Sequence, residues 1–154
     1  MTLKASISGI RGIVGNSLTP QVVVDYISAF VSMINREGAI LVGRDSRQSG
    51  GMISNLVKAT INATGRDAID VGIAPTPVLL FGAYTVDKIA GAVVITASHN
   101  PKEWNALKLI NEKGKFLSPA EFAKLENLYR EKNFRFAKFD SIGKEWTDHT
   151  ILSG

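Results

Sequence analysis

The segment Gly91-Ala92-Val93-Val94-Ile95 constrains the fold of this chain more than any other. It carries no charge, and its last three residues are β-branched, which is typical of a strand buried on both faces of a sheet. Pro101 follows shortly after this strand. Proline cannot continue a hydrogen-bonded ladder, and it keeps Asn100 out of the helical region. The sequence therefore predicts a buried strand that ends in a forced turn before Pro101.

Four hydrogen-bonding side chains gather on this predicted turn, namely Thr96, Ser98, His99 and Asn100. Their concentration at the end of an apolar strand favours a functional loop with Ser98 at its centre. A second interpretation is a strand-ending turn in which Ser98 and Asn100 only satisfy nearby backbone groups. The spacing leaves both interpretations open.

Apolar runs alternate with amphipathic patterns along the chain, which is typical of an α/β fold. A first helix is predicted from the cap Thr19 and Pro20, with its end at Gly38. Further helices are predicted over 51–64, from Thr76-Pro77, and from the capping box Ser118-Pro119-Ala120-Glu121. Strands are predicted at 39–42, 68–71, 91–96 and 107–110.

Three polar segments follow predicted strands, at 43–47, 72–77 and 96–101. Open α/β sheets bind ligands beyond the carboxyl ends of their strands. We therefore expect these segments to lie at one edge of the sheet, although they are far apart in the sequence.

The size and composition are those of one globular domain, with 154 residues, 45% hydrophobic and 21% charged. No segment approaches the ~20 apolar residues of a membrane span, and residues 1–6 lack the apolar core of a signal peptide. We therefore expect a cytoplasmic protein that binds no membrane. The absence of cysteine excludes disulfides and thiolate chemistry. The net charge of +4 suits an anionic partner, but segment 131–146 is expected to be a packed tail and not a nucleic-acid surface.

The hexapeptide Thr96-Ala97-Ser98-His99-Asn100-Pro101 resembles the active-site signature of the α-D-phosphohexomutases, which include phosphoglucomutase, phosphomannomutase and phosphoglucosamine mutase. Four further segments resemble family motifs in the same order: the amino-terminal Arg-Gly loop (8–15), the second basic loop (43–47), the Pro-Thr-Pro turn (72–77) and the Asn-Gly-x-Lys segment (105–108). Ala106 stands where the family usually has glycine, which affects the backbone there because alanine tolerates a positive φ poorly.

The resemblance implies the first of four domains. It predicts a three-layer α/β/α domain with a mixed, mostly parallel sheet over residues 1–146, and the start of a link to a second domain over 147–154. The family's Asp-Gly-Asp-x-Asp metal loop, sugar-recognition loop and carboxyl-terminal phosphate-binding loop have no counterpart in the sequence. We therefore expect a fragment that is inactive alone, with the remaining domains of the same protein as partners. The residues present do not specify which sugar phosphate is used.

Phosphoryl transfer fits the chemistry of such a loop. A serine hydroxyl is a weak nucleophile, and phosphoryl transfer depends mostly on positioning and on compensation of negative charge. The resemblance implies that Ser98 is phosphorylated and exchanges its phosphoryl group with a hexose 1-phosphate or 6-phosphate through a bisphosphorylated sugar. It also implies Mg²⁺ bound through the phosphate on Ser98, with the other ligands from the second domain, and an activator of the glucose 1,6-bisphosphate type.

The site residues carried over by resemblance fall into two groups. The catalytic group is Ser98, His99, Lys108 and Arg11. The phosphate-binding group is Arg11, Gly12, Arg44, Thr96, Asn100 and Lys108.

Simpler roles are open for several of these residues. His99 either moves a proton or is a structural hydrogen-bond donor. Arg11, between Gly9 and Gly12, lies either in a flexible anion-binding loop or in a solvated turn. Lys108 is also what a half-exposed strand would carry, since alternation places it opposite Leu107 and Leu109.

One arginine of the second basic loop is expected to have a structural role. Arg44 and Arg47 flank Asp45, and one of the two should pair with this carboxylate. Only Arg44 is therefore assigned to phosphate binding.

Two other functions compete with a mutase as interpretations of the sequence. A serine hydrolase is disfavoured because adjacent residues such as Ser98 and His99 rarely form a nucleophile–base pair, and no Gly-x-Ser-x-Gly motif is present. A non-catalytic module that binds anions or nucleic acid would agree with the basic charge, but recognition motifs are lacking.

Overall fold

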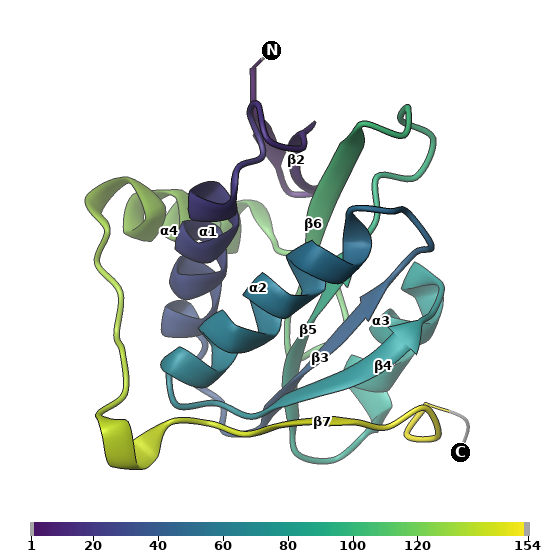
Figure 1. The fold of residues 1–154 in the computed structure, drawn as a ribbon. Coiled ribbons are helices and arrows are strands. Elements are labelled where there is room, and N and C mark those ends of the chain that lie inside the picture. Colours follow the sequence, from purple (N-terminus) through teal and green to yellow (C-terminus); the bar gives the residue numbers. More distant parts are fainter. Residues whose placement is uncertain (1, 153–154) are drawn as a thin grey trace.

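The structure is a computed structural model and describes residues 2–152. Within that range the chain forms three layers, a seven-stranded sheet with helices on both faces (Figure 1). The helices are α1 (Pro20–Met33), α2 (Gly50–Ala63), α3 (Thr76–Thr85) and α4 (Pro119–Glu131). The strands are β1 (Lys4–Ser6), β2 (Gly9–Ile13), β3 (Ala39–Arg44), β4 (Ala68–Ile73), β5 (Ile89–Ile95), β6 (Trp104–Ile110) and β7 (Glu145–Thr147). The predicted α/β/α fold is confirmed.

The sheet has the strand order β1-β2-β6-β5-β3-β4-β7. The pairs β5–β3, β3–β4 and β4–β7 are parallel, whereas the pairs β1–β2, β2–β6 and β6–β5 are antiparallel. The sheet is mixed as predicted, but among the described strands it is half parallel and not mostly parallel. The antiparallel half arises because β6 turns back along β5 and then pairs with the amino-terminal hairpin.

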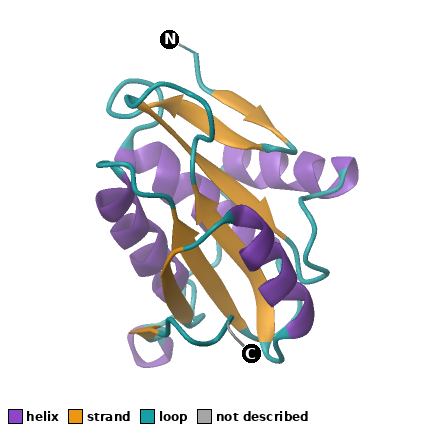
Figure 2. Ribbon diagram, turned by 90° about the vertical axis from the view of Figure 1, so that its right-hand side faces the viewer, coloured by secondary structure: helices purple, strands orange, loops and turns teal. Residues whose placement is uncertain are grey.

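Helices α1, α2 and α4 cover one face of the sheet, and α3 covers the other (Figure 2). Successive residues of β5 therefore belong to different cores: Val93 and Ile95 pack with the first group, and Val94 packs with α3. Every residue of β5 is buried, as predicted from its charge-free sequence. No helix within residues 2–152 is long and apolar enough to span a bilayer.

Local signals at the helix ends agree with the prediction in part. Thr19 Oγ1 accepts a hydrogen bond from Val22 N at 3.2 Å, which confirms the cap of α1. The predicted end at Gly38 is wrong, because α1 ends at Met33 and Ile34 is already extended. Arg66 donates to the carbonyl of Ile34 at 2.9 Å and so satisfies the freed backbone group outside the helix.

The capping box of α4 forms as predicted. Ser118 Oγ accepts from Glu121 N at 3.1 Å, and Glu121 Oε1 accepts from Ser118 N at 2.9 Å. Partial burial opposes the charge of Glu121, but hydrogen bonds from Ser118 and Asn111 outweigh it and lower its pKa. The other predicted elements lie within three residues of the observed bounds.

Three short strands were not predicted. Strand β2 occupies the segment that was expected to be a flexible Arg-Gly loop, and it pairs Ile10 with Leu107 of β6. Strand β1 extends the same edge, and β7 adds to the opposite edge. Their residues carry weak strand signals, because pairing partners far away in the sequence determine these edges.

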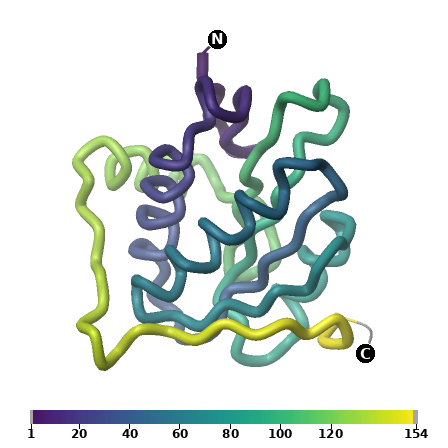
Figure 3. Tube along the Cα trace, in the orientation of Figure 1, coloured from purple at the N-terminus to yellow at the C-terminus, as the bar shows by residue number. Residues whose placement is uncertain are grey.

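The segment after α4 runs along the outside of α1 and then beneath β4 (Figure 3). It packs only in part: Phe134 contacts the core, whereas Phe136 and Phe139 are exposed. Strand β7 then pairs with β4 from residue 145. The predicted boundary between domain and link, at 146, thus falls inside a strand and stays a prediction.

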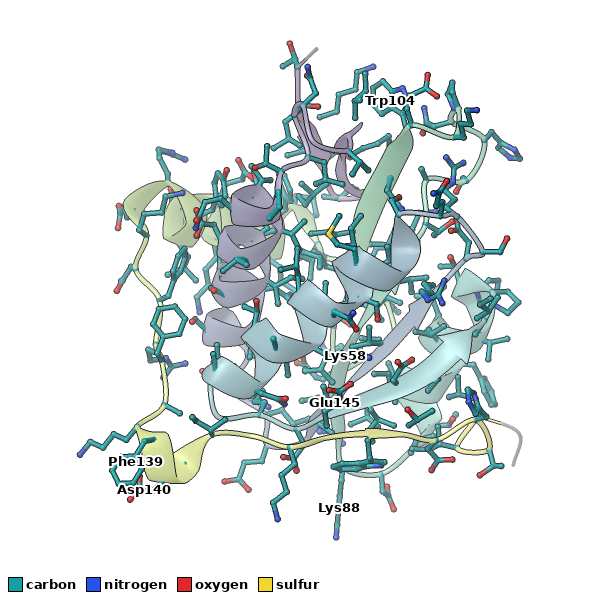
Figure 4. The ribbon with its side chains drawn as sticks, viewed as in Figure 1. Lys58, Lys88, Trp104, Phe139, Asp140 and Glu145 are labelled. Atoms are coloured by element: carbon teal, nitrogen blue, oxygen red, sulfur yellow. The ribbon has the colours of Figure 1, made fainter. Side chains whose placement is uncertain are left out.

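A small ion-pair cluster joins α2, β4 and β7. Lys58 Nζ lies 2.8 Å from Asp70 Oδ2 and 2.8 Å from Glu145 Oε2 (Figure 4). Burial opposes the charges of Lys58 and Asp70, but their mutual hydrogen bond and ion pair raise the pKa of Lys58 and lower that of Asp70. The cluster therefore fixes β7 to the rest of the domain.

Candidate functional site

A cavity of about 220 Å³ lies over the carboxyl end of β5. It is lined by Arg11, Thr96, Ala97, Ser98, His99, Asn100 and Lys108. Most of the predicted site residues are thus brought together from two strands, β2 and β6, and from the loop after β5. Gly12 and Arg44 are not among the lining residues.

A larger cavity of about 600 Å³ lies at the opposite end of the parallel strands, where Gly38, Asp67 and Lys88 line it. It contains none of the residues singled out by the sequence. The smaller cavity is the candidate site because it concentrates a hydroxyl, an imidazole and two cationic side chains.

The end of β5 places Ser98 in an unusual backbone conformation. Thr96 N still donates to Ala106 O of β6 at 3.1 Å, so the sheet continues up to this residue. Ser98 then adopts φ 54°, in the left-handed region. For a residue with a side chain this costs on the order of 1–3 kcal/mol, which the surrounding structure must supply. Thr96 Oγ1 accepts from Ser98 N at 3.3 Å and is one such contact.

Lys108 makes the hydrogen bond to the Ser98 hydroxyl. Its Nζ donates to Ser98 Oγ at 3.0 Å. Alternation along β6 places Leu107 and Leu109 in the core and Lys108 on the opposite face, as predicted. Partial burial, and then the positive charge of Arg11, lower the pKa of Lys108. Lys108 therefore releases its proton more readily than an ordinary lysine, and it lies beside a hydroxyl.

Arg11 reaches the cavity from β2, directly opposite Ala106 on β6. Its position comes from strand pairing and not from a flexible loop. Ala106 is buried within β6 and is not among the residues with positive φ, so alanine is accommodated there without backbone strain. Arg11 and Lys108 together bring two cations to the serine.

Asp45 connects the loop after β3 to the loop after β5. Its Oδ2 accepts from Thr96 Oγ1 at 2.8 Å and lies 3.4 Å from Arg47 Nε. Arg47 is thus the arginine that pairs with Asp45, in line with the prediction that one of the two would. Its Nη atoms also donate to carbonyls of the Ser98 loop, a role that the sequence did not indicate.

The remaining predicted residues have different positions. His99 is exposed at the cavity and Asn100 is half-buried. Gly12 lies within β2, where a Cβ atom would come 2.6 Å from Ser17 Oγ, so it has a packing reason to be glycine. Arg44 Nη1 donates to Asp45 O at 3.2 Å, and the side chain of Arg44 lies beside Gly50 at the start of α2. Its charge also helps to lower the pKa of Asp70.

The parallel strands do bring the predicted loops to one edge. Asp45 N donates to Ile95 O, and Ala74 N donates to Arg44 O. The 72–77 turn is nevertheless absent from the lining of the cavity.

A complete magnesium site is not formed by this part of the protein. Within residues 2–152 no group of three or more His, Asp or Glu side chains could hold a metal ion. The exposed Ser98 oxygen offers one hard ligand of the kind that Mg²⁺ prefers. The residues present therefore fit one coordination position and no more.

Residues 3–136 match the family model described as phosphoglucomutase/phosphomannomutase, alpha/beta/alpha domain I. The chain belongs to this family. A phosphoglucomutase/phosphomannomutase of Thermococcus kodakarensis is 39% identical over 140 residues, which cover 88% of this chain and 30% of that protein. A phosphoglucosamine mutase of Methanococcus aeolicus is 37% identical over 145 residues, which cover 94% of this chain and 31% of that protein.

The fold of a crystallised phosphoglucomutase/phosphomannomutase family protein from Burkholderia thailandensis is also similar. It superposes with a TM-score of 0.81 at 26% identity and covers 96% of this chain and 34% of the other. The present chain therefore spans about a third of the length of the relatives it matches, and that third is the phosphoglucomutase/phosphomannomutase domain I.

Proposed function

We propose that this domain supplies the phosphorylated serine of a phosphohexomutase that interconverts a hexose 1-phosphate and a hexose 6-phosphate. The observation that carries the proposal is the 3.0 Å hydrogen bond from Lys108 Nζ to Ser98 Oγ, in a cavity that Arg11 also lines. A phosphoserine carries about −1.5 to −2 charges near neutral pH. Two cations at the hydroxyl suit that charge.

The proposed step begins with a phosphoryl group on Ser98 Oγ. The bond between phosphorus and Oγ breaks while a bond forms from phosphorus to a hydroxyl oxygen of the sugar phosphate. The product is a hexose 1,6-bisphosphate and a free serine. The sugar hydroxyl loses its proton in this step, and Ser98 Oγ gains one, so the number of protons balances. In the second half-reaction the other phosphoryl group returns to Ser98, so the net change is a shift of phosphate along the sugar.

Lys108 and Arg11 have separate roles in this proposal. Arg11 stays charged and stabilises the negative charge spread over the transferring phosphoryl oxygens. Lys108 has a lowered pKa and contacts the oxygen that gains a proton, so it is suited both to charge compensation and to proton transfer. His99, exposed at the rim, is a second group able to move a proton between sugar and solvent.

The other predicted phosphate-binding residues differ in whether they line the cavity. Thr96 and Asn100 line the cavity and are proposed to contact phosphate. Gly12 and Arg44 do not line the cavity. They would contact a phosphate group only if the bound sugar phosphate extends beyond the cavity, toward the other domains.

Mg²⁺ would bind one oxygen of the phosphate on Ser98 and increase the electrophilicity of phosphorus. Its other ligands would come from the remaining domains, since the described residues offer a single position. A hexose 1,6-bisphosphate is proposed as the activator that first phosphorylates Ser98. Sugar phosphates are charged and do not cross an apolar layer unaided, so we place the reaction in the cytoplasm.

The test uses the full-length protein that contains this domain. Incubation with glucose 1,6-bisphosphate should add one phosphoryl group, which peptide mass spectrometry should locate on Ser98. Ser98→Ala should abolish both phosphorylation and mutase turnover, whereas Ser141→Ala, at an exposed serine on a distant turn, should change neither. A phosphoryl group on another residue, or full turnover in Ser98→Ala, would contradict the proposal.

A serine-hydrolase probe tests the alternative in the same preparation. In the structure the hydroxyl of Ser98 is hydrogen-bonded to Lys108. Lysine is also the base of some serine hydrolases. Labelling of Ser98 by a fluorophosphonate, without phosphorylation by the bisphosphate, would favour hydrolysis over phosphoryl transfer.

A further inference from the structure

Arg47 extends from the segment after β3 into the loop that carries Ser98, and its side chain is only 15% exposed. Nη2 donates to the carbonyls of Ser98 at 3.0 Å and Asn100 at 2.6 Å. Nη1 donates to the carbonyls of Pro101 at 2.6 Å and Trp104 at 3.0 Å. The four Nη hydrogens of the guanidinium thus match four carbonyls, three in the loop and one at Trp104, the first residue of β6.

The backbone of Ser98 is held at both ends. Its carbonyl accepts from Arg47, and its N–H donates to Thr96 Oγ1 at 3.3 Å. One carboxylate orients both partners, since Asp45 Oδ2 accepts from Thr96 Oγ1 and lies 3.4 Å from Arg47 Nε. The residue in this frame is the one with φ 54°, a conformation that a serine does not keep without external contacts.

We propose that Arg47 is a positioning residue for phosphoryl transfer at Ser98. Its guanidinium keeps the loop in the conformation that directs the Ser98 hydroxyl toward Lys108. This inference rests on the proposed function of Ser98 as the phosphoryl acceptor. Arg47 acts through the backbone and not on the substrate, because its Nη hydrogens are all directed to backbone carbonyls.

The shape of the side chain matters more than its charge. A lysine at this position would keep the charge but has three donors on one atom, which cannot span four carbonyls in a planar fork. Arg47→Lys should therefore behave like Arg47→Ala in catalysis while preserving most of the packing. Arg36→Ala is the matched control, because Arg36 is an exposed arginine outside the cavity.

Kinetics in the full-length enzyme provide the first test. Both Arg47 variants should lower kcat and the rate of Ser98 phosphorylation by about a hundredfold, the effect expected of an ångström-scale displacement of a reacting group. The KM for hexose phosphate should stay within about threefold, since no substrate contact is lost. Guanidinium ion in solution should restore part of the rate to Arg47→Ala, and methylammonium should not. An unchanged kcat, or a loss confined to KM, would overturn the proposal.

Hydrogen exchange provides a test that does not depend on activity. In the absence of substrate, amides of residues 97–104 should exchange about tenfold faster or more in both Arg47 variants, and at the wild-type rate in Arg36→Ala. Unchanged exchange in this segment would refute the role of Arg47 in holding the loop. If Ser98→Ala is fully active, the proposed function fails, but the exchange result still decides whether Arg47 holds the loop.

Discussion

Replacement of Lys58 by methionine should destabilise the domain, although Lys58 does not line the candidate site. Methionine keeps the length of the apolar stem and removes the charge. The change breaks both ion pairs of the cluster, with Asp70 and with Glu145. It leaves the Asp70 carboxylate partly buried, with the N–H of Gly72 as a remaining donor.

The expected magnitude follows from exposure. The side chains of Lys58 and Asp70 are 10% and 21% exposed, and that of Glu145 is 43% exposed. Removing one partner of a fully buried pair costs about 3–5 kcal/mol, whereas an exposed pair contributes about 0–1 kcal/mol. Loss of the Lys58–Asp70 pair should cost an amount between these limits, about 2 kcal/mol. Loss of the Lys58–Glu145 pair should cost about 0–1 kcal/mol, as for an exposed pair. Lys58→Met should therefore lower the free energy of unfolding by about 2–3 kcal/mol, equivalent to roughly 4–12 °C in Tm.

Urea unfolding of the 154-residue chain, followed by circular dichroism, measures this difference. The lowered pKa of Asp70 means that its stabilising contribution is present above its ordinary value of 3.8 and is lost as the pH falls below it. The raised pKa of Lys58 means that its contribution is present below 10.5 and is lost above it. The gap between wild type and Lys58→Met should thus be constant between these values and narrow outside them.

Lys124→Met is the control, because Lys124 is an exposed residue of α4. It should change stability by no more than about 0.5 kcal/mol. Equal stability of Lys58→Met and wild type at pH 7, or a gap that persists undiminished at acid pH, would refute the argument from the ion pairs.

Further predictions concern the site and the isolated chain. In the full-length enzyme, Arg11→Met and Lys108→Met should each cost about 2–4 kcal/mol of transition-state stabilisation in kcat/KM, while thermal melts change little. Normal turnover in both variants would show that Arg11 and Lys108 do not stabilise the transition state. The 154-residue chain should melt cooperatively, since its helix faces, strands and caps are mutually consistent. It should nevertheless fail to convert glucose 1-phosphate in a coupled assay and bind Mg²⁺ weakly by calorimetry. Sustained turnover by the purified chain would contradict this expectation.

The parts of the fold that the sequence predicted are those with local causes. The caps of α1 and α4 involve residues three apart in the chain, so Thr19 and Ser118 were sufficient to place them. Strand β5 was predictable because burial on both faces leaves no polar position in its sequence. Strand β2 was missed because it contains two glycines and an arginine, and it is a strand only through its pairing with β6.

In the candidate site, too, the residues with local sequence signals were predictable and those with long-range contacts were not. Ser98 and Lys108 were predicted, the first from its place after a strand and both from the family motifs, and the structure brings them within 3.0 Å. The contacts of Arg47 were not predictable, because its partners are backbone carbonyls, which every residue type carries. The sequence assigns Arg44 to phosphate binding instead, but its guanidinium lies beside Gly50 at the start of α2, and Arg44 does not line the cavity.

Strand β7 gives the end of the described chain a mechanical attachment. It runs parallel to β4 in the register Ala68–Glu145, Ile69–Trp146 and Asp70–Thr147, and the Lys58–Glu145 ion pair joins its first residue to α2. A force applied to residues 148–152 along this strand loads these rungs together, in shear, and does not open them one at a time. The residues of β4 that pair with β7 also pair with Ile40, Leu41 and Val42 of β3, so tension at this end of the chain enters the sheet at the amino-terminal ends of its parallel strands, away from the Ser98 loop.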